Sequence, residues 1–217
     1  MDQKCINGFM NAINSQYSTF NRFKITDYDE ATIREFLKIC YQKEVEIRRK
    51  QFREDEQIKS LLNKAAKWLC CDCKVGLLLY GGVGNGKSTL SRAICKLIEM
   101  LYPNNRFDAK ENAPTIITAL ELAKIAIDEN QQFCKIKECS KLIIDDLGTE
   151  PPTIKSWGNE ISPLTETLYN RYDKQLFTIA TSNLNDKEIK ERYGIRIADR
   201  IEEMFDKLYF NGNSYRR

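Results

Sequence analysis

Histidine is missing from the sequence, which has 217 residues. Histidine is the commonest general base and a frequent partner of nucleophilic serine or cysteine, so its absence excludes Ser-His and Cys-His mechanisms. Zinc sites that mix cysteine and histidine ligands are excluded for the same reason.

Long apolar runs are also missing. No stretch approaches the roughly eighteen consecutive apolar residues that indicate a membrane-spanning helix. Residues 1–10 lack the apolar segment of a signal peptide. We therefore expect a cytoplasmic location.

A strong charge of either sign is absent too. The 34 basic and 31 acidic residues give a net charge of +3, which is too small to require a polyanionic partner but is compatible with nucleic acid. The hydrophobic content of 42% is enough for a real core. The length suits one domain of ordinary size with an appendage.

The eight cysteines include a cluster just before the first strong strand pattern, at Cys70, Cys71 and Cys73. A zinc site built on them would need a fourth ligand from elsewhere, such as Cys134 or Cys139. Because no second C-x₂-C pair is present, reduced structural thiols are favoured over a metal site. A disulfide framework is not expected in a cytoplasmic chain.

The most informative stretch is 75–89. Its first part, 75–80, is an apolar run without polar alternation, which predicts a strand buried on both faces of a parallel sheet. Its second part fits the pattern G-x-x-x-x-G-K-[ST] of a phosphate-binding loop. The predicted nucleotide-binding residues are Gly81, Gly82, Val83, Gly84, Asn85, Gly86, Lys87, Ser88 and Thr89.

This pattern has a direct physical meaning. Glycines let the backbone curl so that successive N–H groups point into one concavity, which the N-terminus of the next helix also faces. Lys87 would reach the β- and γ-phosphates, and the Ser88 hydroxyl would ligate magnesium. The sequence therefore predicts binding of ATP with Mg²⁺.

Hydrophobic periodicity predicts an alternation of strands and helices. The expected strands are 75–80, 115–118, 142–146, 176–181 and 207–210. The expected helices are about 30–52 (after a capping box at 26–29), 58–69, 90–101, 119–126, 162–172, 185–194 and 197–205. Residues 1–25 remain unassigned, 104–112 reads as a polar loop, and 149–161 reads as irregular.

Alternating strands and helices predict an α/β fold: a phosphate-loop NTPase with a mainly parallel five-stranded sheet flanked by helices. Residues 1–55 are expected to be a helical N-terminal appendage that could dock a partner. Residues 56–217 are expected to be the ATPase core.

Two more strand ends carry polar groups. Asp145 and Asp146 end one buried strand, and Asn183 follows the next. Because the carboxyl ends of parallel strands share one edge of the sheet, these groups are expected near the phosphate loop. A strand-end aspartate pair alone would more simply cap a turn or helix, but the phosphate loop on another strand favours a catalytic role.

Six strings together resemble successive motifs of the DnaC/IstB-like AAA+ ATPases, which include helicase loaders, primosomal proteins and transposition helpers. The resemblance covers roughly residues 60–217. The strings are LYGGVGNGKST at 79–89, LIIDDLGTE at 142–150, NRY at 170–172, TSNL at 181–184, GIRIADR at 194–200 and SYR at 214–216.

The resemblance implies roles for the strand-end groups. Asp145 would hold magnesium together with Ser88. Asp146 matches the catalytic acid of the Walker B motif, which orients or deprotonates the attacking water. Asn183 matches the first sensor. Lys87 completes this predicted catalytic set.

It also implies roles for arginines. Arg200, or Arg196 one turn earlier, matches the arginine finger given to a neighbouring subunit, and Arg216 matches the second sensor. A finger stabilises charge on the transferring phosphoryl group and is worth roughly 10³–10⁵ in rate. From the residues alone, a solvated or salt-bridged helix face among acidic neighbours is the favoured interpretation of Arg196 and Arg200.

The chain departs from the common AAA+ pattern in two ways. Many members carry glutamate where Asp146 stands, so a shorter side chain predicts slow turnover that suits a nucleotide switch. The stretch after Arg200 is too short for a helical lid domain, so none is expected.

The leading functional hypothesis is an ATP-hydrolysing helicase loader that self-assembles around single-stranded DNA and acts on a replicative helicase. Lys155 and Trp157 are the candidates for DNA contacts, although a surface loop with a packed tryptophan is the favoured interpretation of each residue. The main alternative is a transposition helper that binds duplex DNA and a transposase. A small-molecule kinase and a non-hydrolysing adaptor are further alternatives.

Overall fold

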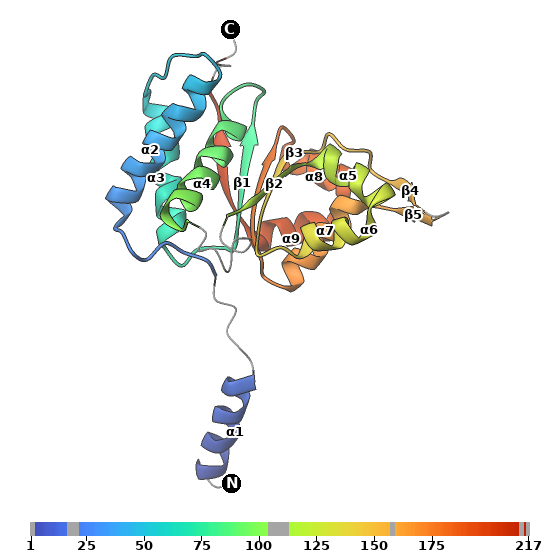
Figure 1. Ribbon diagram of the computed structural model, residues 1–217. Helices are drawn as coiled ribbons and strands as arrows, with labels where there is room; N and C mark the ends of the chain where they lie inside the picture. Colours follow the sequence, from blue (N-terminus) through green and yellow to red (C-terminus); the bar gives the residue numbers. More distant parts are fainter. Residues whose placement is uncertain (1–2, 17–21, 104–112, 157–158, 213–214, 216–217) are drawn as a thin grey trace.

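The computed structural model describes residues 3–16, 22–103, 113–156, 159–212 and 215. Its centre is a five-stranded sheet in which every pair of neighbours is parallel, with the order β2-β3-β6-β1-β7 (Figure 1). These strands are β1 (Gly76–Gly81), β2 (Thr115–Thr118), β3 (Lys141–Leu147), β6 (Phe177–Ser182) and β7 (Phe205–Phe210). The predicted α/β fold with a five-stranded parallel sheet is confirmed.

The helices from α2 onward cover both faces of the sheet, and α1 lies apart from it (Figure 1). The chain has nine helices in its described residues. They are α1 (Gln3–Gln16), α2 (Glu30–Ile47), α3 (Glu56–Cys70), α4 (Lys87–Leu101), α5 (Ala119–Asp128), α6 (Asn130–Glu138), α7 (Pro163–Asp173), α8 (Asp186–Tyr193) and α9 (Ile195–Met204). None of these helices, within the described ranges, is long and apolar enough to cross a membrane.

Strand side chains alternate between two apolar clusters, which explains why the strands read as continuous apolar runs. On β1, Leu77 and Leu79 join the cluster with α2, α3 and α4. Leu78, between them, joins the cluster with α5 to α9. Ile143 and Ile144 of β3 divide in the same way. The strand that leads into the phosphate loop is thus fixed from both sides.

The helix α2 packs against α4 and shares its apolar cluster. Its buried residues Ile33 and Leu37 are fully shielded. The N-cap is Asp29, whose carboxylate accepts from the Thr32 N–H at 2.7 Å; the expected capping box beginning at Thr26 was wrong. The helix ends at Ile47 rather than near Phe52. The division of the chain at residue 55 stays a prediction.

Other differences follow from weak local patterns. The segment 149–161, expected to be irregular, contains an antiparallel pair, β4 (Ile154–Ser156) and β5 (Asn159–Ile161). The helix α6 was not expected, because only Phe133 along it is buried and no apolar stripe marks it. Phe205 begins β7 instead of ending a helix. The expected loop 104–112 lies outside the described residues.

A fully buried arginine, Arg171, connects α7 with β6 and with the end of α6. Arg171 on α7 donates to the Thr178 hydroxyl at 2.7 Å and to the Phe177 carbonyl at 2.6 Å. It also donates to the carbonyls of Cys139 at 2.8 Å and Lys137 at 3.1 Å. Burial lowers the pKa of Arg171 to about 10, so the side chain stays charged at neutral pH.

Replacing Arg171 with Met should lower the free energy of unfolding by at least about 4 kcal/mol, since it removes the donor from four acceptors and each one left unsatisfied costs roughly 1–3 kcal/mol. Urea unfolding measures this. The control is Lys174→Met, which removes an exposed ion pair with Glu138 at 2.9 Å and should cost less than about 1 kcal/mol. Equal stabilities for the two variants would contradict the prediction.

Candidate nucleotide-binding site

The predicted phosphate loop lies between β1 and α4 and needs its glycines. Gly86 caps α4 with a φ of 97°, and Gly81 has a φ of 132°. A Cβ at Gly81 would lie 2.2 Å from the Phe210 carbonyl oxygen, and one at Gly86 would lie 2.4 Å from the Tyr41 hydroxyl. Only glycine therefore fits at either position without moving its neighbours.

Lys87 is buried beneath this loop, with 5% of its surface exposed. Its ammonium donates to the carbonyls of Gly81 at 3.0 Å and Gly82 at 2.6 Å. It also donates to the side-chain oxygen of Asn183 at 2.8 Å. The phosphate-loop lysine and the expected first sensor, 96 residues apart in sequence, are thus in direct contact.

Ser88 and Asp145 are also in contact. The Ser88 hydroxyl donates to Asp145 Oδ1 at 2.7 Å, and the Asp145 side chain is only 5% exposed. Arg92 Nη2 lies 3.5 Å from Asp145 Oδ2. A hydroxyl and a carboxylate are hard oxygen donors of the kind that hold magnesium together with substrate phosphates, so the pair fits the expected Mg²⁺ site.

Thr181 connects both aspartates and was missed as a site residue. Its buried hydroxyl donates to Asp145 Oδ1 at 2.7 Å and accepts from the Asp146 N–H at 2.9 Å. Thr181 comes from β6, beside β3, and has no exposed surface. The only sequence signal for Thr181 was its place in the TSNL string. Its role could not be predicted because it depends on the pairing of β6 with β3, which are far apart in sequence.

The Asp146 backbone is in the left-handed region, with a φ of 59°. The pairing of β3 with β6 changes register between Ile144 and Leu147. The Asp146 carbonyl accepts from the Thr149 N–H at 3.2 Å and hydroxyl at 2.8 Å. This tight turn directs the half-buried Asp146 toward the cleft, whose lining it joins.

A cleft of about 870 Å³ opens over the phosphate loop. One wall carries the loop residues from Val83, together with Asp145, Asp146 and Asn183. The opposite wall comes from the end of α2, the connection to α3, and the C-terminal tail. The residues of this opposite wall are Tyr41, Val45, Arg48, Lys50, Gln51, Phe52, Arg53, Asp55, Ile58 and Tyr215.

Hydrogen bonds tie the opposite wall to the loop. Arg48 Nη1 donates to the Thr89 hydroxyl at 3.0 Å. The Tyr215 N–H donates to the Gly84 carbonyl at 3.0 Å, and its hydroxyl donates to Asp55 at 2.7 Å. Burial raises the pKa of Tyr41 to about 12, so its phenol stays neutral. Nothing in the local sequence pattern shows that the segment 48–53 faces the loop.

The Asn85 side chain anchors the loop to the last strand. Its amide donates to the Phe210 carbonyl at 2.7 Å, and only 2% of the residue is exposed. Asn85 is therefore a structural part of the loop, turned toward β7. Gly82 and Val83, by contrast, are exposed at the mouth.

The two candidate finger arginines both lie on α9. Arg196 is exposed, whereas Arg200 is half-buried with its guanidinium 4.1 Å from the ring centre of Tyr169 and 5.0 Å from that of Tyr172. Neither arginine is one of the described residues that line the cleft. The expected second sensor, Arg216, lies outside the described residues.

The candidate DNA-contacting pair is only partly described. Lys155 is exposed on β4, and Trp157 lies outside the described residues. Lys155 therefore lies on the antiparallel β4-β5 pair and not on an irregular loop.

The cysteine cluster lies away from the cleft lining. Arg22 donates to the main-chain oxygens of Trp68 and Cys71 beside it. Burial raises the pKa of the Cys70 and Cys73 thiols, which disfavours their reactive thiolate forms. In the part of the chain that the structure describes, no three or more Cys, Asp or Glu side chains form a group that could hold a metal.

Comparisons with solved structures give a consistent fold. A structure of DnaI matches with a TM-score of 0.58 and 21% identity, over 76% of this chain and 87% of that one. A DnaC helicase loader matches with a TM-score of 0.53 and 18% identity, over 74% and 93%. The chain has the fold of a DnaC-like AAA+ protein. The expected resemblance is thereby confirmed at the level of fold.

The fold is shared with a replication initiator as well. A DnaA structure with bound AMPPCP and single-stranded DNA matches with a TM-score of 0.51 and 14% identity, over 75% of this chain and 49% of that one. No protein-family model matches the sequence, and no curated protein matches it significantly.

Replacing Thr181 with Val should weaken Mg²⁺-dependent nucleotide binding about tenfold, or roughly 1.4 kcal/mol. The reason is that Asp145 loses a charge-assisted hydrogen bond, typically worth about 1.5–3 kcal/mol. Titration of a fluorescent ATP analogue with Mg²⁺ and with EDTA measures the effect.

The matched control is Thr178→Val, on the same strand and equally buried, whose hydroxyl contacts Arg171 instead. Thr178→Val should lower the stability of the protein. It should not change the ratio of the nucleotide affinity measured with Mg²⁺ to the nucleotide affinity measured with EDTA. If Thr181→Val also leaves that ratio unchanged, Thr181 does not hold the magnesium-binding carboxylate.

Proposed function

We propose that this protein is an ATP-binding and ATP-hydrolysing AAA+ protein that acts as a cytoplasmic helicase loader in DNA replication. The observation that carries the proposal is the meeting of three motifs at one sheet edge. Lys87 contacts Asn183, and Ser88 contacts Asp145. The likeness to DnaI and to the DnaC helicase loader supports replication over the transposition helper.

The nucleotide would bind with its phosphates in the loop 81–89. The Lys87 ammonium would exchange its contacts with the Gly81 and Gly82 carbonyls for the β- and γ-phosphate oxygens. Ser88 and Asp145 would hold Mg²⁺, which would supply charge neutralisation at the phosphates when bound. The apolar and aromatic residues of the opposite wall would cover the base. The AMPPCP in the DnaA structure supports a nucleotide in this fold.

Hydrolysis requires a water aligned with the γ-phosphate. Asp146 faces the cleft and is proposed to orient or deprotonate that water, with Asn183 as a second hydrogen-bonding partner. Because aspartate is one methylene shorter than the glutamate of many AAA+ proteins, turnover should be slow. Slow turnover suits a switch that keeps its ATP-bound state until a partner arrives.

The pocket is proposed to be completed by a neighbouring subunit in an ATP-dependent ring or spiral. Arg196 is exposed and free to project into a neighbour's cleft. Arg200 would first have to leave the rings of Tyr169 and Tyr172. The geometry therefore favours Arg196 as the finger, with Arg200 as the second candidate. Arg216 keeps its proposed role as second sensor.

The proposed partners are single-stranded DNA and a replicative helicase. The DnaA structure that shares this fold was solved with single-stranded DNA, and exposed Lys155 offers a positive group for a phosphate. Co-purification with ATP, ADP or no nucleotide tests the partner. Recovery of a replicative helicase supports the loader, and recovery of a transposase instead would overturn it.

Replacing Asp146 with Asn should lower the ATPase rate at least a hundredfold, since general base catalysis contributes about 10²–10⁴. ATP affinity should stay within about threefold of the original, because the phosphate loop is untouched. Phosphate release and nucleotide titration measure the two quantities. The control Asp128→Asn changes an exposed aspartate at the end of α5 and should leave both unchanged. Undiminished hydrolysis in Asp146→Asn would remove this residue from the mechanism.

Mixing subunits tests the shared pocket. An Arg196→Ala/Arg200→Ala variant keeps its own cleft but gives no finger, and Asp146→Asn keeps its arginines but hydrolyses nothing. Each alone should be nearly inactive, and an equimolar mixture should recover hydrolysis because Asp146→Asn subunits supply arginines to intact clefts. Replacing the arginines singly then assigns the finger. A mixture no more active than its components contradicts completion by a neighbour.

A further inference from the structure

Glu150 is a buried carboxylate that the proposed mechanism leaves without a role. Glu150 follows β3, and only 2% of the residue is exposed. It is not one of the described residues that line the cleft. Its carboxylate accepts from the Gly148 N–H at 2.9 Å and from the Tyr193 hydroxyl at 2.5 Å. Arg192 Nε lies 3.5 Å from the same carboxylate, and Arg192 also donates to the Glu150 main-chain oxygen. A buried carboxylate with two hydrogen bonds and a nearby guanidinium restricts the positions of these partners.

On one side, Glu150 closes the turn that carries Asp146. Gly148 has a φ of 102°, and a Cβ there would lie 2.5 Å from Leu184 Cδ1. The turn is also held by Thr149, which donates twice to the Asp146 carbonyl. The conformation of the proposed catalytic Asp146 therefore depends on a short segment whose far end is Glu150.

On the other side, Glu150 holds the end of α8. Arg192 and Tyr193 immediately precede Gly194, where the chain turns into α9 with a φ of 82°. Open space surrounds the Cβ position of Gly194, so packing does not restrict this junction. Arg196 and Arg200 follow on α9. One carboxylate thus joins the turn of the subunit's own cleft to the helix that carries its finger candidates.

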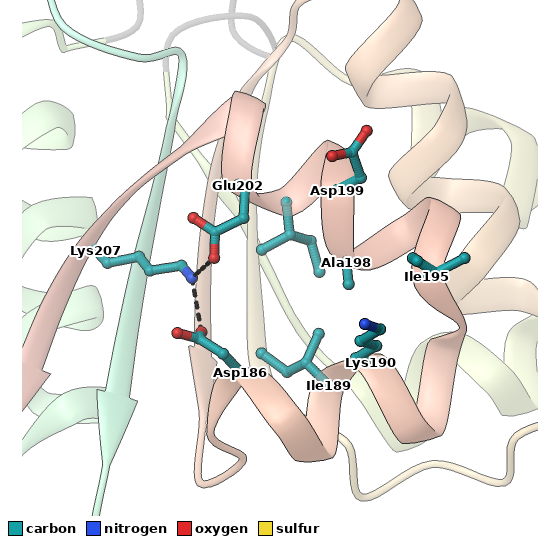
Figure 2. Close-up of a pocket in the computed structure, with 9 residues that line it drawn as sticks. Asp186, Ile189, Lys190, Ile195, Ala198, Asp199, Glu202 and Lys207 are labelled. Atoms are coloured by element: carbon teal, nitrogen blue, oxygen red, sulfur yellow. Dashed lines mark hydrogen bonds and ion pairs between the residues drawn. The ribbon is translucent and has the colours of Figure 1, made fainter.

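The α8-α9 pair has a second polar anchor, shown in Figure 2. Lys207 of β7 donates to Asp186 at the start of α8, at 2.6 Å, and to Glu202 near the end of α9. A cavity of about 240 Å³ lies between the two helices, bordered by Ile189 and Ala198 (Figure 2). Both helices also pack into the shared apolar cluster through Ile189, Ile197 and Ile201, and the contacts at Glu150 and Lys207 add polar restraints at their ends.

We propose that Glu150 is a positioning residue that links the Asp146 turn to the finger helix α9 through Tyr193 and Arg192. The nucleotide state of a subunit's own cleft would then set where that subunit holds the arginine it gives to its neighbour. The inference rests on the proposed shared pocket. A merely structural Glu150 would instead affect stability and nucleotide binding without a separate effect on the finger.

The test measures Tyr193→Phe subunits as finger donors. Tyr193→Phe keeps the ring and removes the hydroxyl that reaches Glu150. It is placed in an Asp146→Asn donor and mixed with Arg196→Ala/Arg200→Ala acceptors, whose own turn and Glu150 contacts are intact. Phosphate release from the mixture should fall about tenfold relative to unmodified donors. Nucleotide affinity of the donor should stay within about twofold. Its melting temperature should fall by about 3–6 °C, because a buried carboxylate loses one hydrogen bond, and the rates are therefore measured well below the melting temperature of both donors.

Tyr102→Phe in the same donor is the matched control, because it removes a tyrosine–aspartate bond at 2.9 Å to Asp27, away from α8 and α9. It should leave the mixture's rate unchanged. Equal rates for Tyr193→Phe and Tyr102→Phe donors would overturn the role of Glu150. Inactivity with unmodified donors would instead overturn the shared pocket itself, so the two failures are distinguishable.

Glu150→Gln keeps the inference testable if Tyr193→Phe does not fold. Gly148 and Tyr193 donate to different oxygens of Glu150, so glutamine keeps an acceptor for one of them, replaces the other with an amide donor, and removes the charge that pairs with Arg192. As a donor it should retain more activity than Glu150→Ala, with donor nucleotide affinity equal in both. A Glu150→Ala donor as active as the unmodified one would contradict the link by a second route.

Discussion

The parallel pairing of β6 between β3 and β1 is the constraint on which the site depends. Leu78 and Ile144 both pair with Ala180, so the three strands end at the same level. This brings the phosphate loop, the two aspartates and Asn183 to one edge, although long connections separate them in sequence. Because β6 lies beside β3, the Thr181 hydroxyl can bond both to the Asp145 carboxylate and to the Asp146 N–H, and it thereby fixes their positions. Apolar clusters on both faces fix the strands that carry this arrangement.

The parts of the fold predicted from the sequence are those with strong local signals. Continuous apolar runs revealed the strands because both faces of the sheet are buried. Glycine spacing revealed the loop because its backbone needs positive φ angles. The opposite wall of the cleft could not be predicted, since Arg48 and Tyr215 reach the loop only through the packing of α2 and the return of the tail. The Asp29 cap shows the same limit: several polar residues precede α2, and tertiary packing decides where the helix begins.

Two buried charged residues, Arg171 and Glu150, show that residues within similar motif strings can have different structural roles. Arg171 and Glu150 both lie in strings that resemble AAA+ motifs, yet neither is among the described residues that line the cleft. Arg171 binds main-chain carbonyls near the starts of β3 and β6 and thereby fixes the end of the sheet remote from the phosphate loop. Glu150 lies at the functional end and connects the Asp146 turn to α8. A motif string alone cannot separate these roles, because both residues are charged members of such strings and only the fold shows what each side chain contacts.

The arrangement on α9 explains why a slow catalytic site would be useful. The finger candidates lie outside the described lining of their own cleft, and Arg200 is held by two tyrosine rings. If hydrolysis needs a neighbour's arginine, an isolated subunit keeps its ATP, and a short Asp146 side chain reinforces that delay. The same turn that positions Asp146 is bonded through Glu150 to Tyr193 at the end of α8, directly before α9, which would serve the next cleft in the proposed assembly. Nucleotide loss in one subunit can then change the geometry offered to its neighbour, so hydrolysis would proceed in sequence along an assembly rather than independently at each site.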